Sequence, residues 1–259
     1  MRTLLTLAAA ATLATATTYA EDSRAETAGG PNVTIGAGVL VKPEYSGADS
    51  YDTMAIPVLS LSKELTRGNT VYLRGLQAGL DHAIDDQLTV GAVANYRFKR
   101  DSSDSNRLRG MNDIDGAYEI GPKVRYQLSP QLGLEATALF DISGAYNGYT
   151  ARAGADYSMP LSEVTMLTFA GGLNYGSKDF NNTYYGVTSA QAIAGRPAYN
   201  PGSGFTNVDA SVGVRHSLTQ HWSVQGNLGA DYLMGDVSDS PLVDAELQPR
   251  LMLGVAYTF

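Results

Sequence analysis

Residues that commonly do chemistry are few in this chain. Its 259 residues include three histidines, His82, His216 and His221, and no cysteine. His216 and Ser217 are the nearest candidates for a base and a nucleophile, but sequence neighbours on a strand point to opposite faces and cannot bond directly. No metal-ligand spacing is evident, because the sequence has neither a histidine pair nor a dense carboxylate loop. We therefore expect a protein that is not an enzyme and that holds no metal or cofactor.

The first twenty residues predict that the chain is exported. Met1–Ala20 has one early charge at Arg2, an apolar stretch and a small-residue cleavage site, which is the pattern of a Sec-type signal peptide. A membrane-spanning helix is the alternative, but the stretch is short and is followed by acidic residues rather than by a basic stop. We expect residues 21–31 to form a short periplasmic segment and residues 32–259 to form one domain. The net charge of −8 argues against nucleic-acid binding.

The elements that must position any site are strands. From Tyr118 to Leu128 apolar residues alternate with polar ones, and Glu119, Lys123 and Arg125 share the polar face. Because alternate side chains of a strand point to opposite faces, one face is apolar and the other is charged. The same alternation recurs along the chain in segments of about ten residues, the length that a transmembrane strand requires.

Three features favour a membrane barrel over a soluble sandwich with the same alternation. Aromatic residues such as Tyr118, Tyr126, Trp222 and Tyr232 stand at the ends of the apolar faces, as interfacial girdles do. The polar faces are rich in small residues, which suits a crowded lumen, and tight turns alternate with long polar loops. We therefore predict an all-β fold, a transmembrane antiparallel up-and-down β-barrel in the outer membrane of a Gram-negative bacterium.

The number of strands depends on one stretch. Eleven segments are obvious, whereas single-chain bacterial barrels have an even number of strands. The apolar parity switches at Arg74-Gly75, so either a bulge or a tight turn lies there. A turn would give twelve strands, which we predict, with ten as the alternative. Further tight turns are expected at Ser129-Pro130, Leu161-Ser162, Thr219-Gln220 and Asp85-Asp86, and long loops at residues 46–53, 100–114, 143–148, 177–204 and 235–245.

The polar faces carry both signs of charge in nearly equal number. A strongly selective channel usually lines its pore with one dominant sign. We therefore interpret these charges as mutually paired parts of a plug, with a path for small solutes as the functional alternative. The acidic excess falls in the external loops, where divalent cations could bridge it to lipopolysaccharide. The expected lumen-facing charges are Arg97, Lys99, Lys123, Arg125, Arg152, Arg215 and Arg250, with Glu119, Glu135, Asp141, Asp156, Asp209 and Asp231.

The last strand is expected to serve assembly. Tyr257 and Phe259 end a run in which every second residue is apolar. A terminal Phe in this pattern is the signal that outer-membrane barrels present to the barrel-assembly machinery. An unclosed edge strand also pairs readily with the edge of another sheet.

Four loop segments carry a family resemblance. They are Pro43-Glu44-Tyr45-Ser46-Gly47-Ala48-Asp49, Tyr184-Tyr185-Gly186-Val187-Thr188 with Ala190-Gln191-Ala192, Tyr199-Asn200-Pro201-Gly202-Ser203-Gly204-Phe205 and Asp239-Ser240-Pro241-Leu242-Val243. Together they resemble loops of the MipA/OmpV family of outer-membrane proteins. The resemblance extends over most of the chain that follows the signal and is densest after Ser177.

This resemblance implies a non-enzymatic scaffold. The family's namesake links a lytic murein transglycosylase to a murein synthase, and such docking would use the short periplasmic turns. Outer-membrane lipid, lipopolysaccharide and the barrel-assembly machinery are further expected partners. A narrow channel is one alternative function. A surface adhesin or antigen is another; it would use Tyr184, Tyr185, Tyr199 and Phe205, which could equally pack into the barrel mouth.

Overall fold

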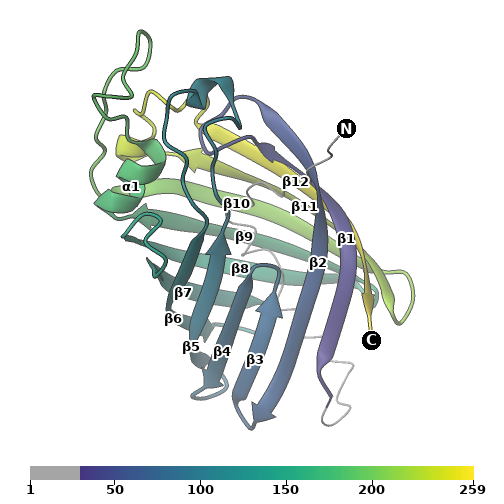
Figure 1. Cartoon of the computed structure of the whole chain (residues 1–259). Helices are drawn as coiled ribbons and strands as arrows, with labels where there is room; N and C mark the ends of the chain where they lie inside the picture. Colours follow the sequence, from purple (N-terminus) through teal and green to yellow (C-terminus); the bar gives the residue numbers. More distant parts are fainter. Residues whose placement is uncertain (1–29) are drawn as a thin grey trace.

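In the described part of the chain, twelve strands form one closed barrel, with one helix and two short 3-10 turns in its loops (Figure 1). The computed structural model describes residues 30–259. The strands are β1 (Asn32–Pro43), β2 (Tyr51–Thr66), β3 (Asn69–Arg74), β4 (Gln77–Ala83), β5 (Leu88–Arg97), β6 (Ala117–Gln127), β7 (Leu132–Asp141), β8 (Tyr149–Ser162), β9 (Thr165–Gly176), β10 (Gly204–Ser217), β11 (Trp222–Leu233) and β12 (Leu247–Thr258). The loop elements are η1 (Asn106–Leu108), α1 (Lys178–Tyr185) and η2 (Gly235–Val237).

Each strand pairs antiparallel with its neighbours in sequence, and β1 pairs with β12 to close the barrel. The closing register runs from Thr34 opposite Thr258 to Val41 opposite Leu251. The point at which the apolar residues change parity is a tight turn, because Arg74 pairs with Gln77 across Gly75 and Leu76. The predicted antiparallel barrel of twelve strands is therefore confirmed.

The outer surface of the barrel is apolar and ends in two aromatic girdles. Exposed aromatic side chains at the end with the long loops include Tyr118, Tyr149 and Tyr232, and those at the end with the short turns include Tyr157 and Trp222. An apolar band between aromatic belts is the surface that a bilayer requires. No helix among residues 30–259 is long and apolar enough to cross a membrane.

Two expected boundaries differ in the structure. The turn between β8 and β9 is Glu163-Val164 rather than Leu161-Ser162, because a register shift between Pro160 and Ser162 lets β8 continue. The first outer loop is residues 44–50 rather than 46–53, since β1 ends at Pro43 and β2 already begins at Tyr51. The barrel begins with β1 at Asn32, whereas the expected signal peptide and residues 21–29 of the expected periplasmic segment lie outside the described residues.

Candidate functional site

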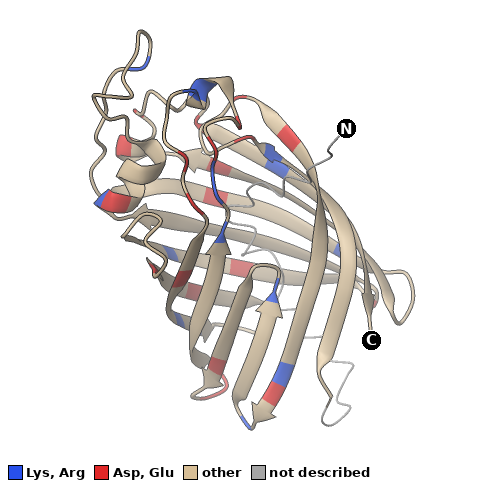
Figure 2. Ribbon diagram, in the orientation of Figure 1, with Lys and Arg blue, Asp and Glu red and all other residues tan. Residues whose placement is uncertain are grey.

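Ion pairs line the inside of the barrel. Arg97 Nε lies 2.8 Å from Glu119 Oε1, and the Glu119 side chain is fully buried. Lys123 Nζ lies 2.8 Å from Asp81 Oδ2. Figure 2 shows blue and red residues interspersed over the strands rather than one sign gathered on one side. Opposite charges thus compensate one another locally within the wall.

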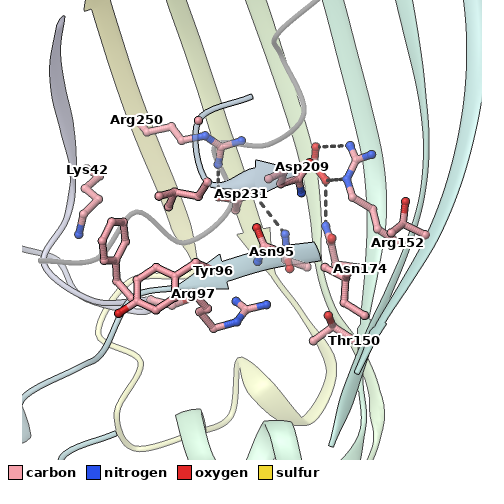
Figure 3. Close-up of a pocket in the computed structure, with 18 of the residues that line it drawn as sticks. Lys42, Asn95, Tyr96, Arg97, Thr150, Arg152, Asn174, Asp209, Asp231 and Arg250 are labelled. Carbon is pink, nitrogen blue, oxygen red and sulfur yellow. Dashed lines mark hydrogen bonds and ion pairs between the residues drawn. The ribbon is translucent and has the colours of Figure 1, made fainter. Parts of the chain in front are cut away.

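Two further pairs are bidentate, and a third joins neighbouring strands. Arg125 donates to both carboxylate oxygens of Asp156 at 2.7 and 2.9 Å. Arg152 donates to both oxygens of Asp209 at 2.9 and 3.3 Å (Figure 3). Arg250 on β12 pairs with Asp231 on β11. Fork-to-fork contacts fix geometry as well as charge.

Three of these pairs reach over an intervening strand. Lys123–Asp81 joins β6 to β4, Arg125–Asp156 joins β6 to β8, and Arg152–Asp209 joins β8 to β10. In each case the residue of the skipped strand that pairs in register with the aspartate is a glycine. The three pairings are Gly91 with Asp81, Gly133 with Asp156 and Gly172 with Asp209.

Gly133 and Gly172 leave room for the crossing arginines, and Gly91 leaves room for the Asp81 carboxylate, since a Cβ there would lie 2.4 Å from Asp81 Oδ1. A Cβ atom at Gly172 would lie 2.5 Å from Nη2 of Arg152, which is closer than non-bonded atoms can approach. A Cβ at Gly133 would overlap the guanidinium of Arg125 in the same way. Glycine in a strand interior often marks a site of close approach, and here the approaching group is a charged side chain. We call these three arrangements the glycine-gated braces.

Other residues that were predicted to face the lumen are less closely paired. Glu135 lies 3.9 Å from Arg125, and Arg215 is half-buried on the same face of β10 as Asp209. Asp81 is absent from the predicted set, although Gln77, Gly79 and Asp81 share one parity after the Gly75 turn. This alternation would have predicted that Asp81 points into the lumen.

The four family-like loop motifs meet over the outer mouth of the barrel. Tyr45 donates its hydroxyl to Leu242 O at 3.0 Å, and the Gly47 amide donates to Gln248 Oε1 at 3.0 Å. Gly47 has φ of +105°, and a Cβ there would lie 2.8 Å from Val243 Cγ2. The first outer loop is thereby fastened to the last one, about 200 residues away in the chain.

The segment around α1 forms the centre of this cap. Tyr185 is buried, its hydroxyl lies 2.8 Å from Ser46 Oγ, and its carbonyl accepts a hydrogen bond from Ser240 Oγ at 2.6 Å. The centre of the Tyr184 ring lies 4.7 Å from the centre of the Phe180 ring. Burial raises the pKa of Tyr184 to about 12. The helix ends at Tyr185 and is capped by Gly186, whose amide donates to Asn182 O.

The third and fourth motifs complete the cap. Tyr199 donates to Asp236 O at 2.6 Å, and the Pro201 carbonyl accepts from Asn182 Nδ2 at 3.0 Å. Arg107 donates to Pro241 O at 2.5 Å. Asp239 is exposed, and nothing lies within 4 Å of a Cβ built at Gly204. Phe205 lies outside on the girdle, against Tyr175, so only part of the aromatic set packs into the mouth.

The underside of the cap touches the lumen. Tyr146 donates to Glu119 Oε1 at 2.6 Å, and the Arg97 guanidinium lies 5.0 Å from the Phe180 ring centre. Beneath the cap a cavity of about 480 Å³ remains, lined partly by the ion pairs. Its lining includes Arg97, Arg152 and Asp209, which Figure 3 shows with Asp231 and Arg250.

The histidines make only neutral contacts. His216 Nδ1 lies 2.8 Å from Thr165 Oγ1, and His221 Nδ1 lies 2.9 Å from Thr258 O. His82 Nδ1 lies 3.0 Å from Asn69 Oδ1. Within residues 30–259 no group of three His, Cys, Asp or Glu residues is placed to hold a metal ion.

Comparison with known proteins identifies the family to which this barrel belongs. Residues 35–259 match the family model described as MltA-interacting protein MipA. The chain belongs to the MipA family. The MltA-interacting protein of Escherichia coli (strain K12) is 28% identical over 231 residues, which cover 87% of this chain and 89% of that protein.

Another relative is the outer membrane protein Omp26La of Vibrio anguillarum. It is 28% identical over 160 residues, and the match spans 61% of each chain, less than two thirds of the relative's length. Among solved structures, the translocator domain of autotransporter NalP from Neisseria meningitidis aligns with a TM-score of 0.51 at 11% identity, over 88% of each chain. That likeness concerns the fold alone. This MipA-family chain is an outer-membrane β-barrel.

Proposed function

We propose that this MipA-family barrel is a non-enzymatic scaffold that works by binding partners at its periplasmic end. Its likeness to the MltA-interacting protein along 87% of the chain is the observation that carries the proposal. The first candidate partner is therefore a lytic murein transglycosylase, with a murein synthase as the second. The glycine-gated braces and the cap agree with this role, because they stiffen the barrel and obstruct a wide pore.

The binding surface would be the ring of periplasmic turns. Each turn described by the structure has two to four residues, from Arg67-Gly68 to Leu218–His221. A stable interface needs about 800 Å² on each side. One such turn is too small, so the partner must contact several turns at once. The exposed side chains of Ile84, Leu161 and Leu218 give that rim apolar surface that a partner could cover.

A binding assay with purified proteins tests this proposal. The barrel would be reconstituted in nanodiscs and titrated with a lytic murein transglycosylase from the same bacterium. Charge-bearing substitutions at the exposed turn residues Pro130 and Gln220 are expected to weaken binding at least tenfold. A matched substitution at Ser189, which is exposed in an outer loop, is expected to leave it unchanged. Absence of saturable binding by the unsubstituted barrel contradicts the proposal.

A narrow path for small solutes is the second candidate, and the cavity of about 480 Å³ is the observation in its favour. Planar-bilayer recording separates the two functions. A scaffold with a braced lumen gives no steady conductance, whereas a solute channel conducts in single, reproducible steps.

A further inference from the structure

The barrel wall is interrupted on one side near its outer end. Strands β3 and β4 have only six and seven residues, whereas the neighbouring β2 has sixteen. Pairing of β2 with β3 stops where Gly75 donates to Leu59 O at 2.8 Å. From Tyr51 to Val58, β2 pairs with β1 on one side, but no strand among residues 30–259 pairs with it on the other. Figure 1 shows the β3–β4 hairpin ending well below the top of β2.

The backbone of β2 is adapted to a free edge. N–H and C=O groups of alternate residues point to the same side of a strand. Leu59 O accepts from the β3 side, so the amide position of Pro57 also points toward the gap. Proline has no N–H to leave unpaired, so it suits a position whose amide would face such an edge. We call the gap between β2 and β5 above the hairpin the side opening.

The lumen cavity reaches this opening. Six consecutive residues of β2, from Met54 to Leu59, line the cavity. Of these six, Ala55, Pro57 and Leu59 are exposed outward residues of the unpaired edge of β2. On the far side of the gap its lining includes Tyr96, Arg97 and Phe98. At this unpaired edge the lining of the cavity thus includes residues of the outer surface.

The lumen face beside the opening is apolar. Met54, Ile56 and Val58 point inward there, opposite Leu40, Gly38 and Gly36 of β1 in register. Elsewhere the inward positions hold the ion pairs described above. Outside the wall, Ala55, Pro57 and Leu59 are exposed, and Tyr51 stands at the top of the strand. An apolar path thus runs from the cavity to the lipid-facing surface at the level of the outer girdle.

Two buried cations lie at the outer end of this path. Lys42 is 9% exposed, follows Leu40 on the inward face of β1 and donates to Pro43 O at 3.1 Å. Arg100 is 8% exposed and donates to Tyr184 O at 2.6 Å. Neither has a carboxylate within 4 Å in the described chain. Buried charges are ordinarily paired, and both of these line the cavity, where Figure 3 labels Lys42.

We propose that the side opening admits a single-chain anionic amphiphile from the outer leaflet of the membrane. Its tail lies along Met54, Ile56 and Val58 and passes through the gap, while its head group lies near Lys42 and Arg100. The cavity volume of about 480 Å³ is within the range of about 300–1,000 Å³ that small-molecule sites occupy. This site is independent of the periplasmic rim and of any murein enzyme.

Quenching from the bilayer tests the opening itself. The chain has no cysteine, so single-cysteine variants carry one label each. A fluorophore at Ile56→Cys, in vesicles whose phosphatidylcholine tails are brominated, is expected to be quenched at least threefold more than one at Thr150→Cys. Thr150 lines the same cavity from β8, across the barrel. Ala55→Cys, on the lipid-facing side, is the positive control. Equal, weak quenching at positions 56 and 150 means that the wall is closed and overturns the proposal.

Ligand protection tests the chemistry of the occupant. Dodecanoate is expected to slow modification of Ile56→Cys by a water-soluble maleimide at least fivefold, and dodecanol much less. Adding Lys42→Gln to that variant is expected to remove most of the protection by dodecanoate, whereas Lys42→Arg retains it. Equal protection by the acid and the alcohol, or no effect of Lys42→Gln, contradicts an anionic ligand. No protection by either contradicts the site. None of these results bears on murein-enzyme binding.

Discussion

The glycine-gated braces make a testable claim about stability, sharpest at Gly172. In an ordinary strand, replacing Gly by Ala stabilises by about 0.5–1 kcal/mol. At Gly172 the added Cβ would lie 2.5 Å from Nη2 and 2.6 Å from Cζ of Arg152, so the guanidinium must move away from Asp209. Removing one partner of a buried ion pair costs about 3–5 kcal/mol, and displacing the guanidinium, the far end of a flexible side chain, costs less than that. Gly172→Ala is therefore expected to lower the free energy of unfolding by about 2–4 kcal/mol.

The assay is urea unfolding in detergent micelles, followed by the fluorescence of Trp222, the only tryptophan. Gly171→Ala is the matched control, because its Cβ would meet only Asp209 O at 3.2 Å, and a change below about 1 kcal/mol is expected. In an Arg152→Ala/Asp209→Asn background, Gly172→Ala is expected to be neutral or stabilising. Equal destabilisation with and without the ion pair would refute the idea that the glycine makes room for the arginine.

Three further predictions concern the cap and assembly. Gly47→Ala, at φ of +105°, is expected to strain the cap by about 1–3 kcal/mol and to speed proteolysis of the outer loops, whereas Gly204→Ala is not. Because burial raises the pKa of Tyr184 to about 12, above the ~10 of free tyrosine, its contribution to stability is full below pH ~10 and is lost as the pH rises toward 12. An ultraviolet titration of the wild type and Tyr184→Phe measures that ionisation. Removing Phe259 is expected to reduce the folded barrel in outer membranes at least severalfold, as seen by its gel mobility without heating.

The sequence contained most of the information about the wall. Period-two alternation predicted the strands, and the parity change at Arg74-Gly75 predicted the turn that makes twelve. The boundary of β8 was missed because a bulge at Leu161 keeps the chain extended past Pro160, which alternation does not reveal. Strand ends depend on pairing with neighbours, and that pairing is a property of the closed sheet.

The interior was less predictable, because it depends on register. The sequence showed many glycines on polar faces, but only the pairing of Gly172 with Asp209 shows what they make room for. The side opening likewise results from strands of unequal length, which the residue pattern of a single strand does not reveal. The cap motifs were visible as a family resemblance, but not the contact between Tyr185 and Ser46, which lie 139 residues apart.

Photo-crosslinking in living cells tests the scaffold function most directly. A photoreactive residue would replace Gln220 at the periplasmic rim or, as the control, Ser189 in an outer loop, and crosslinked proteins would be identified by mass spectrometry. We expect a lytic murein transglycosylase to be captured from position 220 and not from position 189. Capture of no murein enzyme from the rim, with normal barrel assembly, would contradict the proposed function.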